Sequence, residues 1–139
     1  MLANRKTGNT PAYDFISILI NDDFFKGKRC FWGPKGKTFM SPNKKIIYPI
    51  DFFCDDDWLG ILYYTDYLHA YSKRYRDNDL LSIDGKEYTA LEIRQRDEAR
   101  KKFLEEEYGI KLYIVWESEF INNKDNVIDE LFYKIMEEL

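Results

Sequence analysis

The first part of the chain has polar residues followed by apolar residues at helical spacing. Residues 1–10 are polar and turn-forming, so we expect a mobile arm there and a single folded domain over residues 11–139. Thr10 is a suitable N-cap, and Pro11 is tolerated in the first turn of a helix. The apolar positions that follow lie along one side of such a helix: Phe15, Ile16, Leu19 and Ile20. The pattern predicts a helix that begins after Thr10.

Short apolar runs bounded by turn residues predict extended segments over the next forty positions. KRCFW and KTFM flank the sequence GPKG, which predicts a β-hairpin within residues 26–41. The runs 46–53 and 58–65 are rich in aromatic and β-branched residues, which favour strands. Three aspartates at 55–57 predict a turn between them. We therefore expect these two runs to form adjacent strands.

The C-terminal half of the chain predicts a helix, a strand and a second helix. Thr89 and Glu92 form a capping-box pattern, and Gly109 can end the helix in the left-handed conformation. The run 111–116 has the composition of a buried strand. Beyond the ESEF segment at 117–120, apolar residues at helical spacing predict a terminal amphipathic helix: Val127, Ile128, Leu131, Phe132, Ile135 and Met136. This order of elements predicts an α/β fold with a mixed central sheet flanked by helices.

The amino-acid composition limits the classes of protein to which the chain can belong. The 139 residues are 45% hydrophobic and 17% aromatic, which is enough apolar material for one sizeable core. No apolar run approaches the roughly 20 residues that span a bilayer, and the N-terminus lacks the apolar core of a signal peptide. We therefore expect a soluble protein of the cytoplasm with no membrane partner. Cys30 and Cys54 lack the paired spacing of a zinc site, which favours reduced thiols in the core.

Charge is distributed unevenly along the chain. Residues 1–50 contain nine Lys or Arg against three Asp or Glu, a balance of +6, whereas residues 51–139 contain twelve against twenty-two, a balance of −10. A basic N-terminal half suits a polyanion. The acidic part can include ligands for a divalent cation. Ordinary solvated surface charge is the alternative interpretation.

Three residues have the types needed to hydrolyse a phosphodiester. Asp51 lies in the first extended run, His69 follows the second, and Asp97 lies two turns into the long helix. A strand carboxylate can bind Mg²⁺, a nearby histidine can take a proton from water, and a second acid can orient that imidazole. Adjacent strands and a helix packed over their ends would bring the three together. We therefore regard them as candidate catalytic residues, with Asp51 as the metal ligand.

Each candidate also has a structural interpretation. A lone histidine among aromatic residues is commonly packed and hydrogen-bonded. Asp51 needs a partner only if its face of the strand is buried. The segment RQRDEAR around Asp97 has the spacing of surface ion pairs along a helix. The three aspartates at 55–57 are expected to form only a turn.

Four segments carry a family resemblance. They are YPIDFF at 48–53, ILYYTDYLHA at 61–70, RQRDEARKKFL at 94–104 and YIVWESEF at 113–120. In this order and with these gaps they resemble the Vsr-like endonucleases, which include the very-short-patch mismatch-repair nuclease and a group of phage homing endonucleases. The resemblance covers more than half of the chain. It implies a restriction-endonuclease-like fold and Mg²⁺-dependent cutting or nicking of DNA.

The resemblance also assigns roles to individual residues. It implies that Asp51 binds the metal together with a backbone carbonyl near Tyr63. It implies that His69 activates water and that Asp97 supports it. The family also has an acid on its N-terminal helix, for which Asp14 is the best candidate and Asp22 and Asp23 are less well placed. The basic residues after the histidine would follow the DNA backbone, and they are Lys73, Arg74 and Arg76.

The chain departs from the family pattern at three positions. Leu62 replaces a strand glutamate, Thr65 replaces a glycine, and Leu68 replaces a tryptophan. The ligands of the repair enzyme's structural zinc are missing, which favours a phage-type nuclease over a mismatch-repair enzyme. Two alternatives stay open. One is a nuclease-derived protein that no longer cuts and binds DNA or a protein partner; the other is a subunit of a larger assembly. The sequence predicts no oligomeric state.

Overall fold

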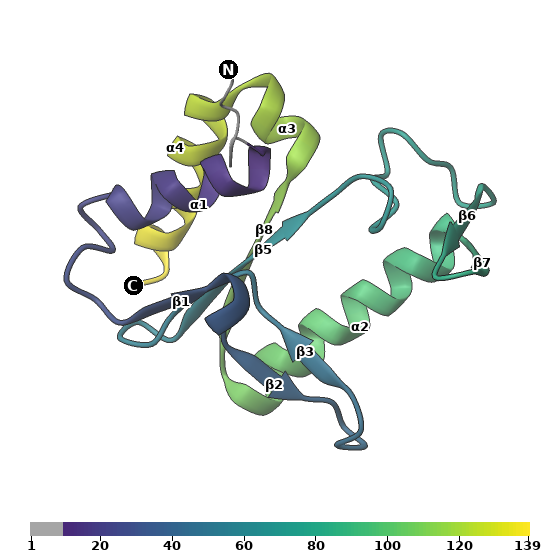
Figure 1. Ribbon diagram of the computed structural model, residues 1–139, viewed down its shortest axis with the longest axis horizontal. Coiled ribbons are helices and arrows are strands. Elements are labelled where there is room, and N and C mark those ends of the chain that lie inside the picture. The colour runs from purple at the N-terminus through teal and green to yellow at the C-terminus, as the bar shows by residue number, and fades with distance from the viewer. Residues whose placement is uncertain (1–9) are drawn as a thin grey trace.

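A four-stranded mixed sheet forms the centre of the fold (Figure 1). Its strands, in order across the sheet, are β1 (Cys30–Trp32), β4 (Phe52–Cys54), β5 (Leu59–Tyr64) and β8 (Lys111–Trp116). β1, β4 and β5 are antiparallel neighbours, whereas β5 and β8 run parallel. The computed structural model describes residues 10–139, so the arm predicted at residues 1–10 lies, except for Thr10, outside the described residues. The predicted α/β class with a mixed sheet is confirmed.

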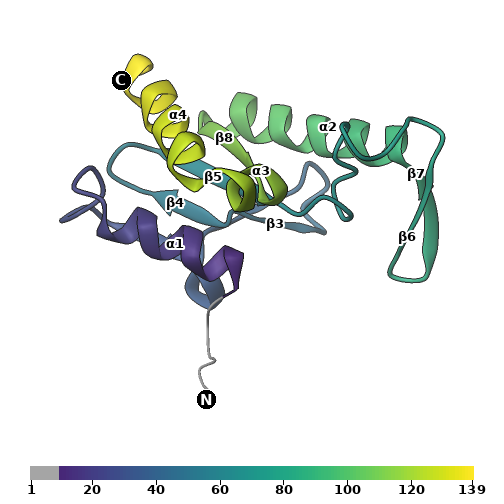
Figure 2. The same cartoon turned by 90° about the horizontal axis from the view of Figure 1, so that it is seen from above.

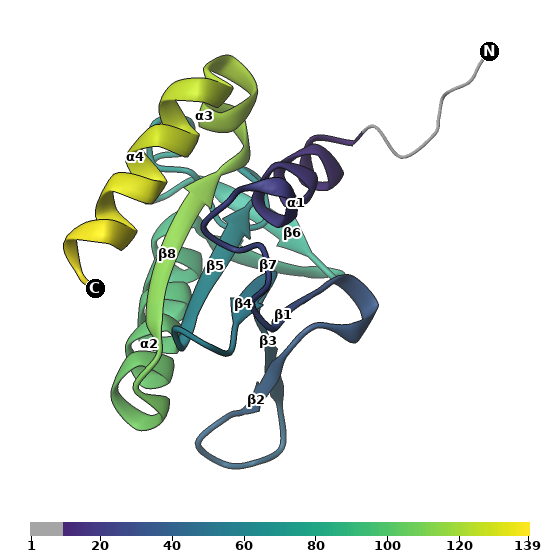
Figure 3. The same ribbon diagram turned by 90° about the vertical axis from the view of Figure 1, so that its left-hand side faces the viewer.

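Helices cover both faces of this sheet (Figures 2 and 3). On one face lie α1 (Pro11–Asn21), α3 (Glu117–Asn122) and α4 (Lys124–Glu137). On the other lies α2 (Ala90–Tyr108). The side chains of β5 separate the two cores because alternate residues of a strand point to opposite faces. Leu59, Ile61 and Tyr63 pack toward α1, α3 and α4, whereas Leu62 and Tyr64 pack toward α2.

The helix boundaries follow the predicted signals. The Thr10 side chain accepts a hydrogen bond from the Tyr13 N–H at the start of α1. Thr89 and Glu92 form a complete capping box at the start of α2, and Gly109 ends that helix with φ of 67°. The segment at 117–120, which the pattern left without a structure, belongs to the short helix α3.

Two small hairpins extend from the body. One pairs β2 (Thr38–Met40) with β3 (Ile47–Pro49), and the other pairs β6 (Leu80–Ile83) with β7 (Lys86–Thr89). The second hairpin was not predicted, although its turn residues Asp84 and Gly85 both have positive φ, which is the signal of a two-residue β-turn.

The hairpin predicted within residues 26–41 is wrong in its pairing. Both of its strands form, but β1 pairs with β4 and β2 pairs with β3. The GPKG segment is a 3₁₀ turn, η1 (Gly33–Lys35), in which Gly33 has φ of 63°. Phe39 of β2 is 7% exposed and packs against Phe53 and Trp58 beneath α2. This burial directs β2 away from the plane of the central sheet.

The strands on either side of the aspartate turn are adjacent, as predicted. β4 and β5 pair antiparallel with Phe52 opposite Ile61. The run 46–53 is interrupted at Ile50 and Asp51, so β3 and β4 belong to different sheets. Cys30 and Cys54 face each other across β1 and β4 as free thiols. Among residues 10–139, no helix has the length and apolar character needed to cross a bilayer.

Candidate active site

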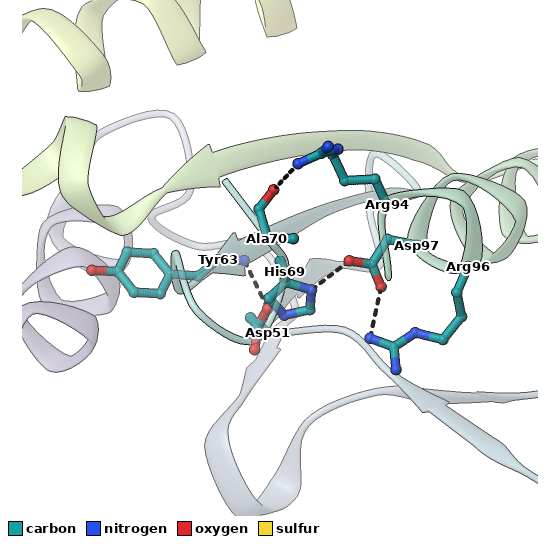
Figure 4. A network of polar contacts seen from close by, with 7 residues as sticks. All are labelled: Asp51, Tyr63, His69, Ala70, Arg94, Arg96 and Asp97. Carbon is teal, nitrogen blue, oxygen red and sulfur yellow. Dashed lines mark hydrogen bonds and ion pairs between the residues drawn. The ribbon is translucent and has the colours of Figure 1, made fainter. Parts of the chain in front are cut away.

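Asp51 immediately precedes β4 and lies near the end of β5 (Figure 4). Its Oδ2 accepts a hydrogen bond from the Tyr63 N–H at 2.7 Å. The break between β3 and β4 frees Asp51 from strand pairing. The carboxylate can therefore turn toward the end of β5 and bond to its backbone. This hydrogen bond fixes the Asp51 carboxylate beside the end of β5.

His69 and Asp97 form a direct pair. The His69 Nδ1 lies 2.7 Å from the Asp97 Oδ2, and the dashed contact in Figure 4 shows the ring meeting α2. Asp97 is 5% exposed although it belongs to a helix rich in charge. Arg96 contributes a second, longer contact of 3.3 Å to the other oxygen of Asp97. The surface ion-pair interpretation of Asp97 therefore does not describe its position, because this carboxylate is buried.

The pairing with Asp97 sets the tautomer of His69. A carboxylate accepts hydrogen bonds only, so the neutral ring must carry its proton on Nδ1 when it faces Asp97. The Nε2 lone pair then remains available. Among residues 10–139, no group donates a hydrogen bond to this nitrogen. His69 is thus arranged to accept a proton at Nε2.

The plane of the His69 ring is fixed by Tyr64. The two rings stack with centroids 3.9 Å apart and an interplanar angle of 9°. The backbone N–H of His69 donates to the Thr65 carbonyl at 3.2 Å, and this bond closes a turn after β5. Burial, reinforced by the nearby Asp97 charge, raises the pKa of the Tyr64 phenol above its ordinary value. Tyr64 therefore stays neutral and supports the ring by packing.

Arg94 ties the His69 loop to α2, a role that the sequence analysis missed. Its guanidinium donates to the carbonyls of Ala70 at 2.8 Å and Tyr75 at 3.2 Å, and it pairs with Asp77. All three partners lie in the loop between β5 and β6. Arg94 precedes Asp97 by three residues, so both lie on neighbouring positions of one helix face. That spacing was the available signal for a second residue of the site.

The electrostatic environment of Asp51 disfavours its charge. The residue keeps exposed surface, but protein atoms around the carboxylate exclude much of the water, and this burial raises the pKa of Asp51. The hydrogen bond from Tyr63 and the charge of His69 oppose the shift. A cation beside Asp51 would relieve the cost of its ionisation.

Two hollows flank the three candidate residues. A groove of about 400 Å³ runs between α1 and β1 and has Asp51 and Tyr63 in its wall. A smaller cavity of about 160 Å³ lies on the α2 side and is lined by His69, Asp97 and Trp116, among others. The candidate residues therefore border open space from both faces of the sheet.

The residues present fit a Mg²⁺ ion bound through one carboxylate. Among residues 10–139, no three His, Cys, Asp or Glu side chains gather in a way that could hold a metal. Magnesium does not require such a cluster, because it keeps several waters and binds through one or two carboxylates and substrate phosphates. Asp51 has one oxygen outside its bond to Tyr63, and it forms no ion pair with Lys, Arg or His among residues 10–139. These features suit such a site.

The other expected site residues lie outside this group. Asp14 pairs with Lys124 of α4 and does not belong to the lining of the groove beside Asp51. Leu62 is 7% exposed in the core beneath α2, so the position at which the resembled endonucleases have a glutamate is apolar and buried here. Three basic residues of the loop after His69 are exposed, and they are Lys73, Arg74 and Arg76.

Comparison of the chain with protein-family models, with curated proteins and with solved structures gave no match.

Proposed function

We propose that the chain is a Mg²⁺-dependent DNA endonuclease of the phage homing type. The observation that carries the proposal is the 2.7 Å contact between His69 and the buried Asp97. Asp51, whose pKa is raised by burial, supplies the carboxylate for a metal in this proposal. A buried acid that orients a histidine beside a metal-binding carboxylate is a recurrent device for activating water. The homing type is supported by the sequence resemblance.

Each side chain of the candidate active site has its own role in the proposed reaction. His69 takes a proton from water at Nε2 while the oxygen of that water attacks phosphorus and the bond to the leaving oxygen breaks. Asp97 accepts the Nδ1 hydrogen bond, which holds the ring and stabilises the imidazolium that forms. Arg94 and Tyr64 hold the loop and the ring in place. Lys73, Arg74 and Arg76 would contact phosphates on either side of the cut.

Asp51 and the backbone carbonyl near Tyr63 would hold the Mg²⁺ ion, with water and phosphate oxygens as its remaining ligands. When bound, the ion would neutralise charge on the phosphate and stabilise the leaving oxygen.

Conversion of supercoiled plasmid to nicked and linear forms in Mg²⁺ tests this proposal. We expect activity from the wild-type chain, and a loss of about 100-fold or more in His69→Ala and in Asp51→Asn. Lys134→Gln, at an exposed position of α4, is the control and should cut normally. Equal rates of plasmid cutting by all four proteins would contradict the catalytic roles assigned to His69 and Asp51.

A second candidate function is DNA binding without cleavage, or binding of a protein partner, by a nuclease fold that has lost activity. The buried, apolar Leu62 favours this candidate, because it stands where the resembled family has a glutamate. Restoring the acid as Leu62→Glu is uninformative because the position is in the core. Gel-shift binding of duplex DNA by a wild-type chain that leaves plasmid intact in Mg²⁺ would favour this function over hydrolysis.

A further inference from the structure

The β2–β3 hairpin presents an outward face that no described residue covers. Its two strands pair with Met40 opposite Ile47 and Thr38 opposite Pro49. All four residues are exposed, with 39% of Met40 and 57% of Ile47 accessible. Figures 1 and 3 show the loop of the hairpin projecting beyond the central sheet. The outer face is therefore a two-stranded ribbon with apolar side chains in water.

The opposite face of the same hairpin is anchored beneath α2. Phe39 packs on Tyr108, and Tyr48 packs edge-on against Phe103. The Tyr108 hydroxyl donates to the Met40 carbonyl at 3.1 Å. The Arg100 guanidinium lies 4.6 Å from the centre of the Tyr48 ring. The ribbon is thus held by its inner face, and its outer face is presented in a fixed orientation.

The hairpin also belongs to the most basic part of the chain. Residues 24–50 contain seven Lys or Arg and no acidic residue. Lys26, Lys28 and Arg29 pair with aspartates. Four lysines form no ion pair with the residues that the structure describes, and they are Lys35, Lys37, Lys44 and Lys45. Two of these, Lys44 and Lys45, lie in the loop at the tip of the hairpin.

The ribbon is joined directly to the candidate active site. β3 ends at Pro49, two residues before Asp51. Arg100, which stacks on Tyr48 of the hairpin, lies one turn beyond Asp97 on α2. Under the proposed function, a duplex that lies along the ribbon would therefore be close to the candidate active site.

We propose that this ribbon enters the major groove of double-stranded DNA and places the bound site relative to Asp51. The inference rests on the proposed function and adds a recognition surface to it. A two-stranded β-ribbon fits the major groove, where apolar side chains can contact the thymine methyl group. Lysines at the tip and base of the ribbon match the flanking phosphates. The excess of unpaired lysines favours DNA over an apolar protein partner or a second copy of this chain.

Binding to two duplexes, one A·T-rich and one G·C-rich, tests the proposal in EDTA, where cleavage is blocked. Met40→Ser/Ile47→Ser should reduce the preference for the A·T-rich duplex about fivefold and leave the salt dependence unchanged. Lys44→Gln/Lys45→Gln should weaken binding to both duplexes equally. It should also lower the slope of log affinity against log salt by about 2.

Matched variants on α3 and α4 control for the loss of exposed apolar and basic side chains. Ile121→Ser/Met136→Ser removes two residues of similar exposure, 52% and 60%, and Lys134→Gln removes an exposed lysine. Both should bind like the wild type. Thermal unfolding followed by circular dichroism should show that every variant folds, because all of the changed side chains are exposed.

The outcomes separate this inference from the function on which it rests. If the wild-type chain cuts plasmid and binds DNA, and the hairpin variants bind like the wild type, the ribbon is not the recognition surface. If Met40→Ser/Ile47→Ser converts a dimer to a monomer in sedimentation experiments without changing DNA affinity, the ribbon is a protein interface. If the wild-type chain neither binds nor cuts DNA, the proposed function fails together with the inference.

Discussion

The surroundings of Asp51 disfavour its negative charge. Its carboxylate accepts a hydrogen bond from Tyr63, but burial still raises its pKa. A side chain that serves folding alone would gain from replacing this charge with a neutral amide of the same shape. Residues that lower stability but supply a charge are common at functional sites. His69 and Asp97 differ from Asp51, because each is the hydrogen-bond partner of the other.

Asp51→Asn should stabilise the metal-free protein at neutral pH. Because the folded pKa of Asp51 is raised from 3.8, the native state binds this proton more tightly than the unfolded state does. The wild type therefore loses stability as the pH rises from about 3.8 through the folded pKa. Urea unfolding at several pH values should show a higher free energy of unfolding for the variant at neutral pH. The difference should shrink toward pH 4.

Two comparisons complete this experiment. Asp129→Asn, on the exposed side of α4, should leave stability within about 0.5 kcal/mol of the wild type. Added Mg²⁺ should stabilise the wild type and have no effect on Asp51→Asn. A variant that is less stable than the wild type at every pH would show that the Asp51 charge supports the fold.

At the scale of elements, α2 organises the site. It carries Asp97 on its buried side, holds the His69 loop through Arg94, and anchors the β2–β3 hairpin through Arg100 and Phe103. A single helix therefore connects the proposed base, its supporting acid and the proposed recognition ribbon. The capping box and Gly109 fix where this helix begins and ends.

Arg94→Lys should loosen the loop that carries His69. The Arg94 Nη1 reaches the carbonyls of Ala70 and Tyr75 while Nη2 reaches Asp77, and the single nitrogen of lysine cannot reproduce this fork. We expect faster amide hydrogen exchange over residues 65–79 and about a tenfold fall in kcat, with little change in KM for DNA. Arg29→Lys, an exposed residue that pairs with Asp55, is the control. Unchanged exchange in the loop would show that Arg94 is only a surface contact.

The sequence predicted where helices and strands lie better than it predicted which strands pair and which side chains meet. The caps at Thr10, Thr89 and Gly109 each marked a helix boundary, because a cap acts on adjacent backbone groups. The pairing of β1 with β4 was missed because it depends on where Phe39 is buried, and distant contacts do not appear in a local pattern. For the same reason, the sequence suggested that His69 and Asp97 meet but gave no sign that Tyr64 stacks on His69. For Arg94 it offered only the spacing to Asp97 along the helix, which does not name the carbonyls that Arg94 binds.

At the scale of the whole molecule, two segments of opposite charge lie in different parts of the fold. Residues 24–50 contain seven basic residues and no acid, whereas residues 124–139 contain five acidic and two basic residues. The basic segment forms β1 and the β2–β3 hairpin, and the acidic segment contains α4, which covers the face of the sheet opposite α2. Such separation orients a protein as it approaches a polyanion. DNA would therefore approach from the side of the hairpin rather than that of α4.

Arg74→Ala should weaken DNA binding to the same degree for unrelated sequences. The Arg74 side chain is 66% exposed and lies 3.6 Å from Asp66, a long contact that leaves its other donors free for a phosphate. Fluorescence anisotropy titrations at several salt concentrations should show a slope of log affinity against log salt that is lower by about 0.9. A loss confined to one sequence would indicate contact with a base, and no loss would indicate an ordinary solvated arginine.

Chemical rescue of His69→Ala by free imidazole tests the central claim most directly. Removal of the side chain should leave space beside Tyr64 and Asp97 in which imidazole can bind and accept the proton from water. We predict that added imidazole restores part of the Mg²⁺-dependent plasmid nicking to His69→Ala and none to Asp51→Asn. Nicking by His69→Ala at the wild-type rate without imidazole, or no nicking by the wild-type chain in Mg²⁺, would contradict the assignment of His69 as the base.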